Sequence, residues 1–215
     1  MSNMPNDREQ RRAALVRAAM RAIHRHGPDV AMEDIATEAG VSKPILYRHF
    51  LDKGDLYMAV SETATEQLRT ALLPSLTADA EPRAALRLVI GEYLAFIERQ
   101  PQLYRFVVRR SFTDRPLSRD PVTTNAALIA ETLATILRDR LRALGLDSGG
   151  AETWAHAGVG MVQAAADWWL EHRTLSRDAL RDYLVTLAWG GLSGIVPAQP
   201  TANPTRRLSA GPIST

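Results

Sequence analysis

The spacing of apolar residues is helical from near the N-terminus to about residue 192. Leu15, Ala19 and Ile23 recur on one face of a first helix, for which Asp7 is the predicted N-cap and the Gly-Pro pair at 27–28 the predicted end. Further helices are predicted at 32–39, 43–50, 53–73, 83–99, 102–112, 123–144, 151–171 and 176–192. The pattern therefore predicts an all-α protein of about nine helices.

Helix length and composition divide the chain into three parts. Residues 1–52 form a unit of three helices, and residues 53–196 form a larger helical unit. The segment 197–215 is rich in Pro, Ala, Ser and Thr and has no acidic residue, so we expect a disordered tail. No fixed-period repeat is present, which argues against a solenoid.

Charge and composition exclude several classes of function. The chain has 26 Lys and Arg against 24 Asp and Glu, so any nucleic-acid surface must be local. The absence of cysteine excludes disulfides and thiolate sites and fits a reducing cytoplasm. The polar N-terminus does not resemble an export signal. The longest apolar run, 155–170, is interrupted by polar residues and is too short to span a membrane, so no membrane partner is expected.

The segment 32–50, MEDIATEAGVSKPILYRHF, has the pattern of a helix-turn-helix. Gly40 is the predicted turn, Ile35 and Ala36 supply the apolar face of the first helix, and Val41, Leu46 and Phe50 are the predicted anchors. Ser42 is predicted to cap the second helix by accepting the Ile45 amide hydrogen. The side chains left on outward or lateral faces are Lys43, Pro44, Ile45, Tyr47, Arg48 and His49, which have the reach and chemistry for DNA. A structural helical hairpin with solvated charges is the alternative.

The run DIATEAGVSKPILYRHFLDKGDLY resembles the signature of TetR-family transcriptional regulators, over about the first 60 residues. Ala31 departs from the pattern, since the family has Thr or Ser as the cap there. Losing that cap costs about 1 kcal/mol, which Glu33 and Asp34 in the first turn partly offset.

The resemblance implies DNA contacts by position. Base edges would be read by Ser42, Lys43, Pro44, Ile45 and Arg48, and phosphates would be held by Tyr47, His49 and Lys53. The arginine-rich first helix has two interpretations. Arg8, Arg11 and Arg12 reach phosphates or a minor groove, or the whole face is solvated.

The last two predicted helices carry the pattern of a dimer interface. The helix at 151–171 is apolar nearly all round and therefore needs partners on two sides. The residues predicted for a homodimer interface are Met161, Val162, Ala165, Trp169, Leu180, Tyr183, Leu184 and Leu187. An ordinary monomer core is the alternative explanation of these stripes.

Aromatic residues of the larger unit are candidates for lining a ligand cavity. They are Tyr93, Phe96, Tyr104, Phe106, Phe112, Trp154 and Trp168. For any single one, a place in the core is the more usual role. Arg105, Arg109 and Arg110 either hold an acidic head group or reach solvent. SKPILYRHF together with WWLEHRTLSRDALRDYLVTLAWGGLSG is similar to actinobacterial members of the family that govern fatty-acid and lipid metabolism, which implies a lipidic or acyl-CoA effector.

The sequence thus predicts a cytoplasmic regulator, most simply a repressor, that a small apolar or acyl-type effector releases from double-stranded operator DNA. The helix at 53–73 would connect the two units and transmit the signal. An architectural DNA-binding protein without effector is one alternative. A helical enzyme is the other, but no catalytic motif, cofactor motif or metal-ligand spacing is present, and the chain is predicted to be no enzyme.

Overall fold

The computed structural model of the protein describes residues 4–76, 80–108 and 121–193. These residues form nine α-helices and no strand, which confirms the all-α prediction. In chain order they are α1 (Met4–His26), α2 (Met32–Glu38), α3 (Lys43–His49), α4 (Lys53–Leu76), α5 (Pro82–Arg99), α6 (Pro101–Val108), α7 (Pro121–Ala143), α8 (Ala151–His172) and α9 (Arg177–Ser193).

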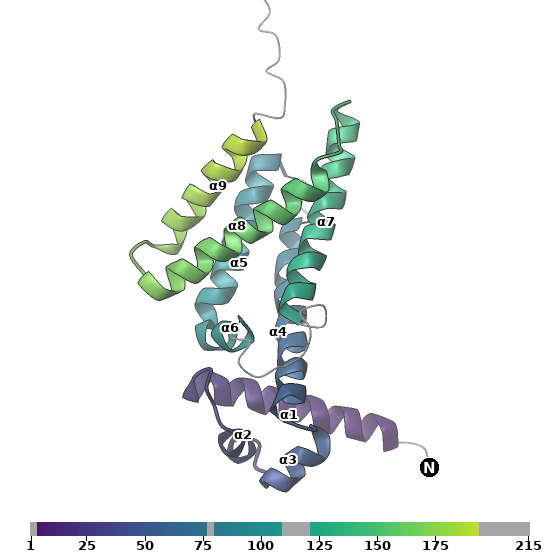
Figure 1. Cartoon of the computed structure of the whole chain (residues 1–215), viewed down its shortest axis with the longest axis vertical. Coiled ribbons are helices and arrows are strands. Elements are labelled where there is room, and N and C mark those ends of the chain that lie inside the picture. The colour runs from purple at the N-terminus through teal and green to yellow at the C-terminus, as the bar shows by residue number, and fades with distance from the viewer. Residues whose placement is uncertain (1–3, 77–79, 109–120, 194–215) are drawn as a thin grey trace, which may run out of the picture.

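The first three helices gather at one end of an elongated molecule, and α4 rises from them into the other helices (Figure 1). A first apolar core holds α1, α2, α3 and the first half of α4 together. Leu46 and Phe50 are fully buried in it, beside Ile23 and Ile35. Helix α6 also belongs to this core through its buried residues Leu103 and Phe106, although it follows α5 in the chain.

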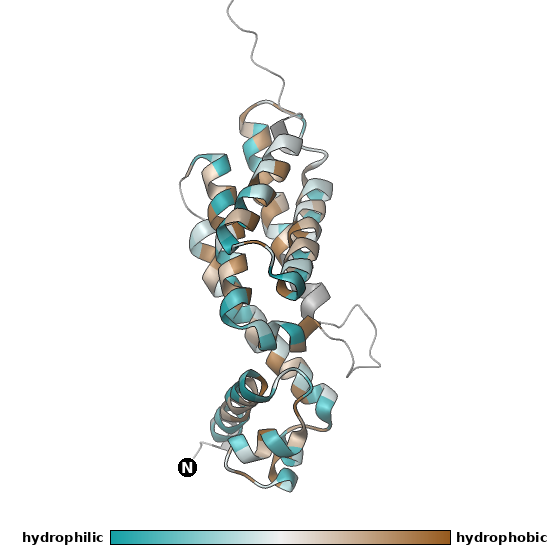
Figure 2. Ribbon diagram, turned by 90° about the vertical axis from the view of Figure 1, so that its left-hand side faces the viewer, coloured by the Kyte–Doolittle hydropathy of each residue, from teal (hydrophilic) through white to brown (hydrophobic). Residues whose placement is uncertain are grey.

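A second apolar core lies in the upper part, where α5 packs against both α4 and α9, and α7 packs against α4 and α8. The buried residues Leu94 of α5, Trp169 of α8 and Leu184 of α9 meet in this core. Brown, apolar positions of the ribbon run through both parts in Figure 2, and Leu68 and Ala71 of α4 pack against the second core. Helix α4 therefore belongs to both cores, as the sequence predicted.

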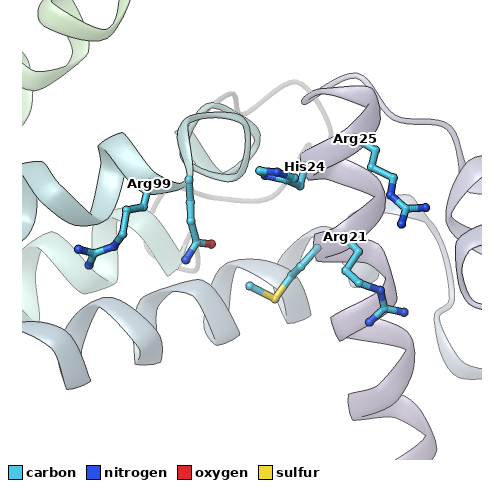
Figure 3. Close-up of a pocket in the computed structure, with 6 residues that line it drawn as sticks. Arg21, His24, Arg25 and Arg99 are labelled. Atoms are coloured by element: carbon cyan, nitrogen blue, oxygen red, sulfur yellow. The ribbon is translucent and has the colours of Figure 1, made fainter.

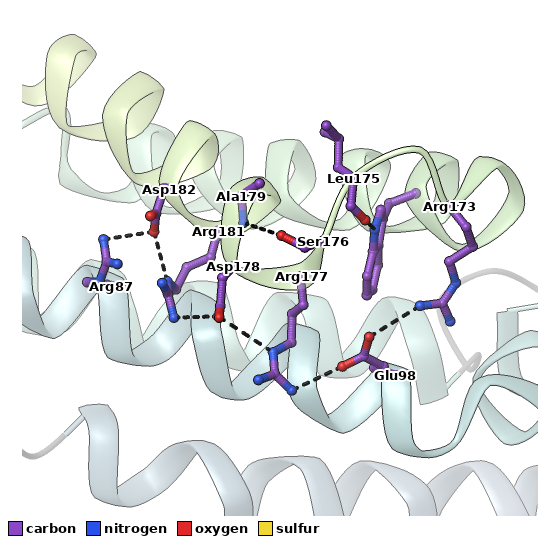
Figure 4. Close-up of polar contacts among 11 residues, drawn as sticks. Arg87, Glu98, Arg173, Leu175, Ser176, Arg177, Asp178, Ala179, Arg181 and Asp182 are labelled. Atoms are coloured by element: carbon purple, nitrogen blue, oxygen red, sulfur yellow. Dashed lines mark hydrogen bonds and ion pairs between the residues drawn. The ribbon is translucent and has the colours of Figure 1, made fainter.

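Alternating charges tie α9 and the end of α8 to α5 (Figure 4). Glu98 of α5 accepts from Arg177 at 3.0 Å and from Arg173 at 3.4 Å. Arg87 of α5 lies 2.8 Å from Asp182 of α9. These side chains are largely exposed, so each pair stabilises the packing only modestly. No helix among the described residues is long and apolar enough to cross a membrane.

Among the described residues, the largest differences from the predicted helix ends are at the start of α1 and the end of α4. Helix α1 starts at Met4, so Asp7 lies in its first turn and bonds Arg11 at 2.9 Å instead of capping the helix. Helix α4 continues through Pro74 to Leu76, although proline has no N–H to donate to the preceding turn. The predicted tail 197–215 lies outside the described residues.

Candidate nucleic-acid interface and effector region

The turn between α2 and α3 has the geometry that the sequence predicted. Gly40 has a φ of +66°, which favours glycine, and the Val41 amide donates to the Ala36 carbonyl at 3.0 Å. No side chain caps α2 at Ala31, but the Asp34 carboxylate accepts the Ala31 amide hydrogen at 3.2 Å. This bond is the reciprocal half of a capping box, and the half that a Ser or Thr side chain would supply, a bond accepted from an amide in the first turn of α2, is absent.

Helix α3 buries one side and exposes the other. Leu46 and Phe50 have no exposed surface, and they anchor the helix in the first core. His49 at the last position is half-buried. The exposed side chains of the segment are Ser42, Lys43, Pro44, Ile45, Tyr47 and Arg48. One short helix thus presents a cationic, hydroxyl-bearing and partly apolar face to solvent.

Ser42 precedes α3 but does not cap it through its side chain, contrary to the prediction. Its backbone carbonyl accepts the Ile45 amide hydrogen at 2.9 Å, so that amide is already satisfied. The Ser42 hydroxyl is therefore left on the exposed face, where it can donate to or accept from a ligand.

The two cations of this face differ in their surroundings. Lys43 forms an ion pair with Glu33 of α2, and their hydrogen bond raises the pKa of Lys43 and lowers the pKa of Glu33. Both groups are solvent-exposed, so a phosphate or base can replace Glu33 at small cost. Arg48 forms no ion pair with any residue that the structure describes, and its guanidinium faces solvent.

A polar cluster that the sequence did not predict fixes the junction of α3 and α4. Arg12 of α1 donates to Asp55 at 2.8 Å, and its guanidinium lies 4.6 Å from the centre of the Phe50 ring. Asp55 also accepts the Leu51 amide hydrogen at 3.1 Å. Asp52 accepts the Asp55 amide hydrogen at 2.7 Å, so this amide at the start of α4 is not open to a phosphate. Lys53 begins the same helix and is half-buried.

Most arginines of α1 are held by acidic groups of the protein itself. Arg11 pairs with Asp7, and Arg21 and Arg25 both pair with Glu38. These pairs favour the interpretation of a largely neutralised face.

A hollow of about 370 Å³ separates α1 from the turn between α5 and α6. Its lining residues are Met20, Arg21, His24, Arg25, Arg99 and Gln100. Figure 3 shows Arg21 and Arg25 turned away from His24 and Arg99, so these cations do not converge on one point.

The predicted ligand-lining aromatic residues only partly come together. Phe96 is buried in the second core, against which Tyr93 and Tyr104 pack. Phe106 instead lies in the first core, 5.6 Å from the Tyr57 ring of α4. The remaining three lie elsewhere: Trp154 packs over Gly150, Trp168 is exposed and stacked on His172, and Phe112 falls outside the described residues.

A polar group lies where α5, α6 and α8 meet. The Tyr104 hydroxyl donates to Asp167, and the Tyr93 hydroxyl lies 3.5 Å from that of Tyr104. Burial raises the pKa of Asp167 and of both phenols, that of Tyr93 to about 12. Arg105, a candidate for holding an acidic head group, donates to the Leu170 carbonyl at 3.1 Å instead.

Among the described residues, no group of three or more His, Asp or Glu side chains is placed so that it could hold a metal ion.

Comparison with known proteins decides the family. Residues 15–60 match the bacterial regulatory proteins of the tetR family, and residues 67–203 match the tetracyclin repressor-like C-terminal domain. The chain belongs to the TetR family. An HTH-type transcriptional regulator of Mycobacterium tuberculosis is 40% identical over 193 residues, which cover 88% of this chain and 80% of that protein.

Two further relatives are similar to this TetR-family chain. The HTH-type transcriptional activator FasR of Mycolicibacterium smegmatis is 31% identical over 191 residues, covering 87% of this chain and 85% of FasR. The structure of FadR from Bacillus subtilis in complex with stearoyl-CoA has a TM-score of 0.66 and 18% identity, covering 83% of this chain and 98% of FadR. These relatives are transcriptional regulators, and FadR shares the fold.

Burial divides the dimer-interface residues predicted for this TetR-family protein. Trp169, Leu180 and Leu184 are buried inside the protomer, where Trp169 also donates to the Leu175 carbonyl at 2.8 Å. Met161, Val162 and Ala165 are half-buried against the same core. Tyr183 and Leu187 of α9 are 65% and 64% exposed, and Trp168 of α8 is 45% exposed. Of the predicted interface residues, Tyr183 and Leu187 are therefore the two whose side chains are mostly exposed and could meet another copy.

Proposed function

We propose that the chain binds double-stranded operator DNA in a sequence-specific manner, with α3 in the major groove. The observation that carries this function is the exposed outer face of α3 above the buried anchors Leu46 and Phe50. In this arrangement base edges are read by Ser42, Lys43, Pro44, Ile45 and Arg48, and phosphates are held by Tyr47, His49 and Lys53.

The DNA-binding unit is proposed to comprise residues 1–52, and the unit for ligand binding and dimerisation residues 53–196. An acyl-type effector, such as an acyl-CoA, is proposed for the second unit. The complex of FadR with stearoyl-CoA supports this class of ligand. The resemblance of segments 42–50 and 168–194 to family members that govern lipid metabolism supports it too. The proposed contacts are the residues near the second core, Tyr93, Phe96 and Tyr104. The proposed action is binding to operator DNA in the cytoplasm, without catalysis.

Helices α4 and α6 connect the proposed effector site to the DNA. Tyr57 and Val60 of α4 lie in the first core, and Leu68 lies against the second. The Tyr57 hydroxyl donates to the Val107 carbonyl of α6 at 2.6 Å, so a shift of α6 moves α4. In a two-fold dimer the recognition helices must lie about 34 to 36 Å apart to enter successive major grooves. A ligand that tilts α4 therefore weakens operator binding.

The effect on transcription is a separate part of the proposal. We expect repression that the effector relieves, because a bound dimer blocks a promoter by occupancy alone. The relative FasR is a transcriptional activator, so the same kind of DNA-binding domain also serves activation. Expression of a reporter gene placed downstream of the operator, measured with and without the protein, shows whether the protein represses or activates transcription.

The test of the proposed function is a titration of a duplex selected from random-sequence DNA, with and without stearoyl-CoA. We expect the ligand to weaken operator binding by about 5-fold to 150-fold, and operator to weaken ligand binding by the same factor. Arg48→Ala should weaken binding and change the preferred bases, whereas Arg140→Ala on α7, a matched loss of one exposed arginine, should not. If stearoyl-CoA binds and operator affinity stays unchanged, the coupling through α4 is wrong.

A further inference from the structure

Lys43, the first residue of α3, is held by a side chain of the preceding helix. Its ζ nitrogen donates to the carboxylate of Glu33, which lies in the first turn of α2. The same nitrogen lies 6.0 Å from the centre of the Tyr47 ring, one turn further along α3. The side chains of Lys43 and Glu33 are 45% and 61% exposed, so the pair is on the surface. The ammonium group is therefore placed by the protein before any DNA arrives.

This pairing changes the kind of partner that suits Lys43. The hydrogen bond raises the pKa of Lys43 and lowers the pKa of Glu33, so at neutral pH both are charged and the pair is neutral as a whole. A phosphate that displaces Glu33 exchanges one exposed anion for another and leaves an unpaired carboxylate beside the DNA, so it gains little. An ammonium group has three N–H donors, however, and Glu33 uses one of them. The other two can reach neutral base acceptors, such as O6 and N7 of guanine, while the pair stays intact.

We propose that Glu33 determines DNA specificity: its ion pair keeps Lys43 from binding phosphates as a free charge and leaves it to donate hydrogen bonds to operator bases. This inference rests on the proposed DNA binding by α3. On DNA of random sequence the paired lysine contributes little, because non-specific affinity comes from phosphate contacts. On the operator its two remaining donors meet base edges. Glu33 thus lowers the affinity for random DNA more than the affinity for the operator.

Glu33→Gln tests this role, because it keeps the size of the side chain and removes its charge. The full chain is titrated with the selected operator and with a random-sequence duplex of the same length, over a series of salt concentrations. We expect the affinity for the random duplex to rise about two- to fivefold per recognition helix, since one exposed charge contact is gained. The salt dependence of that binding should steepen by about 0.9 in slope per recognition helix. Operator affinity should change by less than about twofold per recognition helix, so the ratio of the two affinities falls.

A Lys43→Met background separates an action through Lys43 from simple repulsion between Glu33 and DNA. In that background Glu33→Gln should lose most of its effect on the affinity for the random duplex and on the salt slope. The matched control is Glu66→Gln on α4, which removes a carboxylate that is 60% exposed and paired with Arg69. This control should match wild type with both duplexes. The midpoint of thermal unfolding shows that each variant is folded.

The outcomes separate this inference from the proposed function. If Glu33→Gln leaves both affinities and the salt slope unchanged, or keeps its full effect in the Lys43→Met background, the role of Glu33 is refuted and DNA binding by α3 stands. If folded Glu33→Gln loses operator affinity alone, Glu33 contacts a base itself, and the role proposed for it is equally refuted. If no duplex is selected and Arg48→Ala leaves DNA binding unchanged, the proposed function is refuted, and the role of Glu33 with it.

Discussion

Burial sets the properties of single polar residues in the upper part of the molecule. The pKa of the Tyr93 phenol rises from an ordinary value of 10.0 to about 12, because burial disfavours its charged form. In the unfolded chain the phenol ionises near its ordinary value. Stability from this group is therefore fully present below pH 10 and is lost as the pH rises from about 10 through about 12.

Tyr93→Phe should flatten this alkaline loss of stability, because phenylalanine has no proton to release. The measurement is the midpoint of thermal unfolding between pH 8 and pH 11.5. Above pH 10, we expect the thermal midpoint of Tyr93→Phe to rise relative to that of wild type. Tyr47→Phe removes an exposed phenol and should follow the wild-type curve. Parallel curves for Tyr93→Phe and wild type would contradict the role of burial.

Neighbouring aromatic residues show why single contacts were hard to predict from the sequence. Trp168 and Trp169 are adjacent, yet one is exposed and the other buried, because consecutive helix positions point about 100° apart. Composition shows that aromatic residues are present but not which core each one joins, and Phe106, predicted to line a ligand cavity of the larger unit, lies in the first core. Asp167 is the one acidic residue in the apolar run 155–170, which was the available signal for a buried polar group, but from the sequence the polar residues of this run argued only against a membrane span.

At the scale of elements, the helix-turn-helix was predictable because each local feature points to the same structure. Gly40 fits a positive φ, Pro44 fits a first turn, and Leu46 and Phe50 fit one buried face. What could not be predicted is the support from other elements. The pairing of Arg12 with Asp55 joins residues 43 positions apart, and no local pattern specifies such a contact.

Arg12 is expected to act on DNA binding through Asp55 rather than by touching DNA. Arg12→Met should weaken operator binding by up to about fivefold, because a part-exposed ion pair contributes about 1 kcal/mol or less to the junction of α3 and α4. In an Asp55→Asn background the same change should have almost no further effect.

The measurement is the operator Kd of the four proteins of this double-mutant cycle. Arg17→Met, an exposed position on α1, serves as a control for the loss of charge. If the losses of binding free energy in the two single variants add up in the double variant, Arg12 contacts the DNA directly.

At the scale of the whole molecule, two stacked cores share α4 and α6. The sequence predicted the sharing of α4 from its length and its apolar residues at both ends. It did not predict that Leu103 and Phe106 of α6 reach into the first core, because that depends on how the chain turns after α5. The link from α6 to α4 through Tyr57 thus emerges only from the packing.

The dimer surface follows from the same packing. Leu184 is buried against α5 and α8 within the protomer, so Leu184→Asp should lower the thermal midpoint rather than separate two copies. Tyr183 and Leu187 lie on the exposed side of α9. The double variant Tyr183→Asp and Leu187→Asp should keep the fold and yield monomers, since it places unpaired charges in the proposed interface. Leu144→Asp, at another exposed leucine, is the control.

Sedimentation measures the mass of each variant, and operator titration measures the consequence. A monomer engages one half-site, so the double variant should lose operator affinity far more than affinity for random duplex DNA, where phosphate contacts suffice. The Leu144→Asp protein should match wild type in both measurements. If the folded double variant sediments as a dimer, the two copies meet elsewhere, and the spacing of the recognition helices must be set by a surface other than α8 and α9.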